Sequence, residues 1–176
     1  MRIRRGVVAS GLAMALLVGG AGCGKVAEKA AEKAIEHSGE CDDVDIKDGG
    51  VSGTCGDETF DADLDGASLP ADWPAELALP AGAKIILSNS SDTPPSANVT
   101  AGLDGEINAV YDGIKTQLTE AGYTIDSDSL AQSGSGLAGS LAATGPVHEV
   151  HVVVTESPNA IEGNLSLVYT VTPAAG

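Results

Sequence analysis

The residues most suited to binding a metal form an acidic stretch, Asp57 to Asp72, which reads DETFDADLDGASLPAD. Its centre follows the pattern D-x-D-x-D-G, the opening of a calcium loop in which alternate carboxylates converge on one cation. The favoured interpretation is a solvated acidic strand and linker that binds no cofactor, with calcium as the alternative. The candidate calcium ligands are four carboxylates: Asp61, Asp63, Asp65 and Asp72.

The segment His148-Glu149-Val150-His151 is one residue shorter than the zinc-protease motif HExxH. That motif works because two histidines four apart share one face of a helix. Val147 to Val154 instead reads as a strand, and strand alternation places His148 and His151 on opposite faces. We therefore expect no zinc site here. The sequence contains no GxSxG, SxxK or phosphate-binding loop, so no catalytic residue is assigned and the protein is expected not to be an enzyme.

The N-terminus has the layout of a secretory signal. Three arginines precede an apolar run, Val7 to Val18, and the small residues Gly19 to Gly22 follow. The apolar run is short for a transmembrane helix, which needs roughly 20 residues. We expect residues 1–22 to be removed.

Ala21-Gly22-Cys23 resembles the lipobox of bacterial lipoproteins, although Gly20 stands where that family prefers leucine. The resemblance implies that Cys23 carries a diacylglyceryl group and becomes the acylated N-terminus. The protein would then be anchored by lipid to the outer face of the cell membrane. Ordinary secretion and an uncleaved anchor are the alternatives.

Lipidation of Cys23 would leave Cys41 and Cys55 to form a disulfide in an oxidising compartment. Lys47-Asp48-Gly49-Gly50 between them is a strong hairpin turn signal. A three-residue loop, 47–49, would place the two cysteines opposite each other. Closing this loop would stabilise the hairpin by roughly 3 kcal/mol.

The charge of the chain excludes nucleic acid as a partner. The net charge is −16, and removal of the three N-terminal arginines would leave six lysines against 25 acidic residues, a net charge of −19. Phosphate binding needs basic patches, which such a chain lacks. Aromatic residues make up only 3% of the sequence, which disfavours a stacking platform for sugars or bases.

The elements predict an α+β fold. Its antiparallel sheet of about six short strands has one amphipathic helix, 105–121, on one face, with Asp104 as the N-cap. A helical stalk, KVAEKAAEKAIE, and a disulfide-closed hairpin precede this domain. Trp73 is expected to pack a proline-rich connector onto the domain, with a binding hot spot as the alternative. The predicted regions are the signal 1–22, stalk 23–40, hairpin 41–66, connector 67–82 and domain 83–173.

The Gly-Cys-Gly-Lys junction, the Ala-Glu-Lys helix, the acidic hairpin and the segment LPADWPAELALPAGA together resemble small uncharacterised lipoproteins of actinobacteria. This family brings no known activity. We expect a non-enzymatic binding module of the cell envelope with a protein or cell-wall partner. One alternative is a carrier of a small apolar ligand between helix 105–121 and the sheet, near Ile114 and Leu118. The other is an envelope enzyme.

Overall fold

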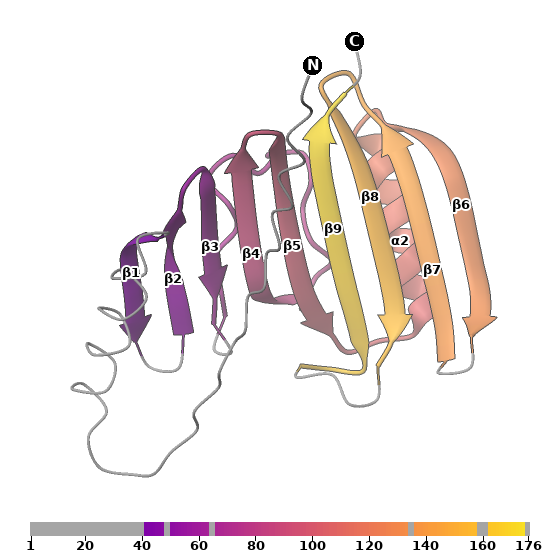
Figure 1. Cartoon of the computed structure of the whole chain (residues 1–176). Helices are drawn as coiled ribbons and strands as arrows, with labels where there is room; N and C mark the ends of the chain where they lie inside the picture. Colours follow the sequence, from indigo (N-terminus) through magenta and orange to yellow (C-terminus); the bar gives the residue numbers. More distant parts are fainter. Residues whose placement is uncertain (1–40, 48–49, 64–65, 134–135, 158–161, 175–176) are drawn as a thin grey trace, which may run out of the picture.

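The computed structural model of the protein describes residues 41–47, 50–63, 66–133, 136–157 and 162–174. These residues form one continuous antiparallel sheet in the order β1-β2-β3-β4-β5-β9-β8-β7-β6 (Figure 1). The strands are β1 (Asp42–Lys47), β2 (Gly50–Cys55), β3 (Glu58–Ala62), β4 (Lys84–Asp92), β5 (Pro95–Leu103), β6 (Thr124–Ser133), β7 (Gly136–Thr144), β8 (His148–Glu156) and β9 (Leu165–Pro173).

The predicted fold class is wrong. The structure is dominated by a nine-stranded sheet rather than by a six-stranded α+β domain behind a stalk and a separate hairpin. The reason is the pairing of β3 with β4 across the connector, in which Phe60 lies opposite Asn89. This pairing joins the hairpin region to the same sheet. The predicted stalk, 23–40, lies outside the described residues.

Helix α2 (Ile107–Glu120) lies on one face of the sheet, behind β6, β7 and β8 in Figure 1. It ends in a Schellman motif: Gly122 has a positive φ of 87°, and the Tyr123 N–H donates to the Leu118 carbonyl at 2.9 Å. Its start differs, because Glu106 rather than Asp104 is the N-cap. The Asn164 side chain fixes the approach to the helix through two hydrogen bonds to the Gly105 backbone, of 2.8 and 2.9 Å.

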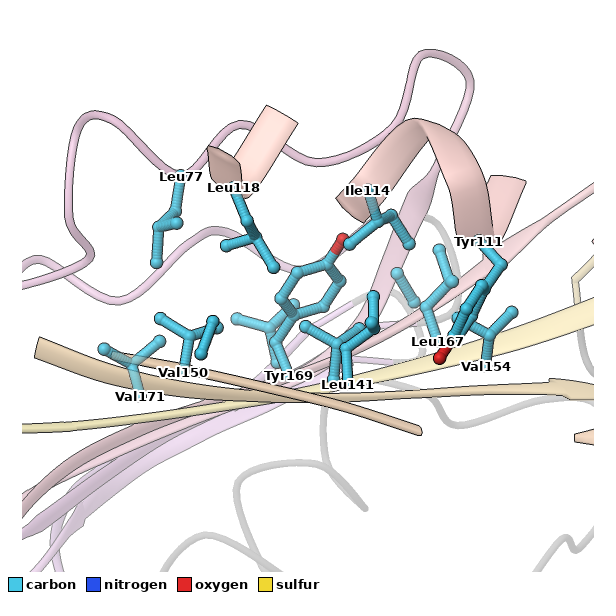
Figure 2. Close-up of a cluster of buried hydrophobic side chains, with 14 of the residues drawn as sticks. Leu77, Tyr111, Ile114, Leu118, Leu141, Val150, Val154, Leu167, Tyr169 and Val171 are labelled. Atoms are coloured by element: carbon cyan, nitrogen blue, oxygen red, sulfur yellow. The ribbon is translucent and has the colours of Figure 1, made fainter. Parts of the chain in front are cut away.

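The core fills the space between the sheet, α2 and the connector (Figure 2). Strands β5, β7, β8 and β9 each point alternate side chains into it, which gives a continuous apolar layer. Trp73 packs the connector onto this layer as predicted. Its ring meets that of Tyr169 edge to face at 6.0 Å, and its Nε1–H donates to the Leu77 carbonyl at 2.6 Å.

Candidate functional site

The predicted cysteine sites fall into two groups. Cys23 lies outside the described residues, whereas Cys41 and Cys55 are joined by a disulfide bond of 2.05 Å. The turn is tighter than expected, because Lys47 pairs directly with Gly50. A bulge between Asp42 and Asp45 absorbs the extra residue and brings the cysteine end of the hairpin into its disulfide-forming position.

The three candidate calcium ligands that the structure describes, Asp61, Asp63 and Asp72, are not grouped around one point. Asp61 is part of β3, and its carboxylate accepts a hydrogen bond of 2.8 Å from the Ser68 N–H. The Asp63 N–H donates to the Ile86 carbonyl, so the backbone here continues alongside β4 in an extended form. Asp65 lies outside the described residues, and Asp72 lies in the connector. Within the described ranges, no three His, Cys, Asp or Glu side chains are grouped so that they could hold a metal ion.

The two histidines of HEVH lie on opposite faces of β8, as the strand alternation predicts. His151 is exposed, whereas His148 faces the covered side with Val150 and Val152. The His148 Nδ1 atom is buried without a hydrogen bond and lies 3.7 Å from the Glu76 carboxylate of the connector. The pair therefore has no common metal position, and His148 belongs to the packing of the connector.

The space between α2 and the sheet is a closed core. Ile114 and Leu118 are each 2% exposed and meet the sheet residues Leu141 and Tyr169 directly (Figure 2). Such packing does not favour the apolar-ligand carrier, which needs a deep pocket at this position. The Tyr169 hydroxyl is buried here without a hydrogen-bond partner.

Tyr111 fastens α2 to the sheet edge. Its hydroxyl donates to the Asp128 carboxylate of β6 at 2.7 Å and accepts the Ser129 N–H at 3.0 Å. Burial, followed by the hydrogen bond to Asp128, raises the pKa of Tyr111 to about 12. Hydrogen bonds from Lys115 and Tyr111 lower the pKa of Asp128. This charged network is structural, because it holds the helix against the terminal strand.

Among the described residues, neither α2 nor the connector lies over the opposite face of the sheet, which we call the open face (Figure 1). Its side chains on β5, β7, β8 and β9 are short and mostly uncharged. They include eight hydroxyl-bearing residues: Ser96, Thr100, Ser140, Thr144, Thr155, Ser166, Thr170 and Thr172. In a chain with 25 acidic residues, this face is poor in charge and forms the candidate binding surface.

One row of side chains crosses the open face without a break in register. Phe60 on β3 lies opposite Asn89 on β4, which lies opposite Asn98 on β5. Asn98 lies opposite Thr170 on β9, which in turn lies opposite His151 on β8. Directly opposed residues of antiparallel strands share a face, so these five side chains form a line perpendicular to the strands. We call them the cross-strand row.

A shallow hollow of about 130 Å³ lies at the β8 end of the row. The residues that line it include His151 and Thr170 of the row, together with two carboxylates, Asp126 and Glu149. The Thr144 hydroxyl donates to Asp126 at 2.7 Å, and the His151 Nε2 lies 3.0 Å from the Ser140 hydroxyl. The hollow therefore concentrates hydrogen-bonding groups at one place on the open face.

Ser140 and His151 are residue types that form nucleophile–base pairs in hydrolases. The backbone around Ser140, however, differs from that of such a site. Ser140 lies on β7, an interior strand whose backbone groups pair with β6 and β8. The neighbouring N–H groups thus belong to the sheet ladders and are not available as an oxyanion hole. The structure therefore shows this pair as a hydrogen bond on the open face, without the backbone donors that acyl transfer uses.

A second hollow, of about 270 Å³, lies between the connector and the covered face of β3 and β4. Its polar groups bond mainly to one another: the Thr59 and Ser90 hydroxyls are 2.7 Å apart, and Asp61 accepts the Ser68 N–H. This internal pairing leaves the hollow less suited to a ligand than the open face.

Comparison with known proteins adds no relative. No protein-family model, curated protein or solved structure matches the chain. In the part of the chain that the structure describes, no helix is long and apolar enough to cross a membrane. The function is therefore argued from the N-terminal sequence and from the geometry of the open face.

The cross-strand row could not be predicted from the sequence. Asn89, Asn98, Thr170 and His151 come from four strands, and nothing in the local pattern of one strand identifies its partner. The available signal was the scarcity of charge at alternate positions of β5, β7 and β9, in a chain that is otherwise strongly acidic.

Proposed function

We propose that the protein is a lipid-anchored, extracytoplasmic binding module of the cell envelope, without enzymatic activity. The observation that carries the binding role is the open, charge-poor face of the sheet. Depletion of charged residues is a mark of the central part of recognition surfaces. The chain is strongly acidic. A face of the sheet that contacted only solvent would therefore be expected to be acidic as well.

The anchor at Cys23 is supported by the sequence of residues 1–23, with its basic start, short apolar run and small residues before the cysteine. The disulfide between Cys41 and Cys55 accords with an oxidising compartment outside the cytoplasm. A lipid at Cys23 would hold the acidic domain at a membrane whose anionic headgroups would otherwise repel it.

The test of this proposal is a pull-down of the full chain from native membranes, with mass spectrometry of the bait and of the captured material. The expected N-terminal peptide begins at Cys23 and carries acyl mass. A Cys23→Ala chain should leave the membrane fraction. A peptide that begins elsewhere, or an unmodified Cys23, would contradict the anchor.

The binding role is tested separately, by placing a charge on the open face. Val168 is 38% exposed on the open face, and Val147 is 63% exposed in the turn before β8. Val168→Asp should reduce capture of the native partner, whereas Val147→Asp should not. Equal capture by both variants would show that the open face is not the binding surface.

A further inference from the structure

We propose that the cross-strand row binds an uncharged polysaccharide chain that lies across the strands, parallel to the row. This inference rests on the proposed binding function and names its partner class. The row consists of Phe60, Asn89, Asn98, Thr170 and His151, whose register is continuous from β3 to β8.

The chemistry of the row suits sugar hydroxyls. Asn89 and Asn98 each offer an amide that donates and accepts, and Thr170 adds a hydroxyl that does both. His151 contributes a ring nitrogen that already lies 3.0 Å from the Ser140 hydroxyl. Hydroxyl groups of a sugar need this mixture of donors and acceptors. A protein partner would instead favour aromatic and apolar anchors at the centre of the contact.

The β3 end of the row is the apolar ring of Phe60. A Cβ atom placed on Gly53 would lie 3.2 Å from the Phe60 ring, so the ring rests against the Gly53 backbone. Phe60 is half-buried, so part of the ring remains accessible. Phe60 is the one Phe, Tyr or Trp of the row, so the row is not a stacking platform, and this single ring can pack against one sugar ring at one end. The remaining contacts are hydrogen bonds.

The shape of the row matches a linear, repeating ligand. Neighbouring strands lie about 4.8 Å apart, so the row from β3 to β8 extends about 20 Å in a straight line. The hollow lined by Asp126, Glu149 and His151 lies at its far end and can receive the hydroxyls of one further sugar unit. A short polymer of repeating units fits this arrangement better than a compact ligand does.

The charge of the chain selects a neutral polymer. The row contains no lysine, arginine or carboxylate, and the whole chain has a net charge of −16. The three lysines of the described residues are each paired with an acidic side chain: Lys47 with Asp45, Lys84 with Glu162 and Lys115 with Asp128. An anionic polymer would thus meet repulsion, and within the described ranges every lysine that could compensate it is already paired.

The experiment is an amide NMR titration of the full chain with neutral linear oligosaccharides: maltohexaose, cellohexaose and fully N-acetylated chitohexaose. At least one should shift the amide signals of β4, β5, β9 and β8 while leaving those of α2 in place. Asn98→Ala and Thr170→Val should each weaken this binding at least tenfold. Thr155→Val, which lies on the same face but outside the row, should change it less than twofold.

Each other outcome overturns the assignment. These outcomes are no shift with any of the three probes at millimolar concentration, shifts that map to α2, or equal binding by the row variants and Thr155→Val. Dextran sulfate that binds as tightly as the neutral probes would contradict the charge argument. A protein captured on the row without glycan binding would overturn the polysaccharide and leave the proposed binding function intact. An unacylated Cys23 would overturn the anchor without affecting the titration.

Discussion

The two faces of the sheet carry side chains of different chemistry, although these side chains alternate along the same strands. On β9, Leu165, Leu167 and Tyr169 point into the core beneath α2 and the connector, whereas Val168 and Thr170 point to the open side. The covered face is apolar and closely packed, whereas the open face carries mostly short side chains, many of which bear a hydroxyl group. We infer that the covered face supplies most of the stability, so that side chains on the open face can bind a partner. The predictions below test that division.

The largest expected effect comes from neighbouring residues of β9. Leu167 is fully buried, whereas Val168 is 38% exposed. Leu167→Ala should lower the free energy of unfolding by about 2–5 kcal/mol, because it leaves a cavity in the core. Val168→Ala should lower it by less than about 1 kcal/mol, since it removes little buried surface. Urea unfolding followed by circular dichroism measures both, and similar losses for the two variants would refute the division between faces.

A second comparison uses a buried glycine of the sheet, Gly139, and an exposed glycine of the helix, Gly113. A Cβ atom on Gly139 of β7 would lie 2.5 Å from the Tyr111 ring, and that ring is held in place by its hydroxyl bonds to β6. Gly139→Ala should therefore cost about 1–3 kcal/mol through overpacking. Gly113 of α2 has open space at the same position, so Gly113→Ala should stabilise the helix by about 1 kcal/mol.

Thermal unfolding of these two variants decides the second comparison. The melting temperature should fall for Gly139→Ala and rise for Gly113→Ala. A rise for both would mean that the contact between Tyr111 and β7 is loose, and that the covered face is less closely packed than the structure indicates.

The sequence predicted the elements better than their assembly. Gly122 and Tyr123 marked the end of α2, and the valines of β8 marked its covered face, because both signals are local. The length of β6 could not be predicted in the same way, because Asp126 and Asp128 interrupt its apolar pattern. The joining of β1–β3 to the main sheet was missed because it depends on the distant β3–β4 pairing. The cross-strand row was missed for the same reason.

A third comparison concerns two tyrosine hydroxyls beneath the sheet. The Tyr169 hydroxyl is buried without a partner, whereas the Tyr111 hydroxyl bonds to Asp128 and the backbone of β6. Tyr169→Phe should raise the free energy of unfolding by about 1 kcal/mol, because it removes an unsatisfied group. Tyr111→Phe should lower it by about 1 kcal/mol, because it removes made hydrogen bonds. Chemical denaturation gives both values, and a loss of stability in Tyr169→Phe would indicate that its hydroxyl has a partner.

The last prediction concerns the ionisation of buried tyrosines. Its effect on stability is the smallest near neutral pH, because it appears only above pH 10. Burial and the nearby Glu76 carboxylate raise the pKa of Tyr123 to about 12, and burial with the Asp128 hydrogen bond raises that of Tyr111 to the same value. The unfolded chain releases these protons near pH 10. The tyrosine contribution is therefore complete below pH 10 and is lost as the pH rises towards 12. Unfolding midpoints from pH 8 to 12 should fall over this window, and they should fall less steeply in Tyr111→Phe. If the unfolding midpoint of Tyr111→Phe falls with pH as steeply as that of the unchanged protein, Tyr111 is as accessible as a surface tyrosine. The covered face would then be open to solvent beside α2.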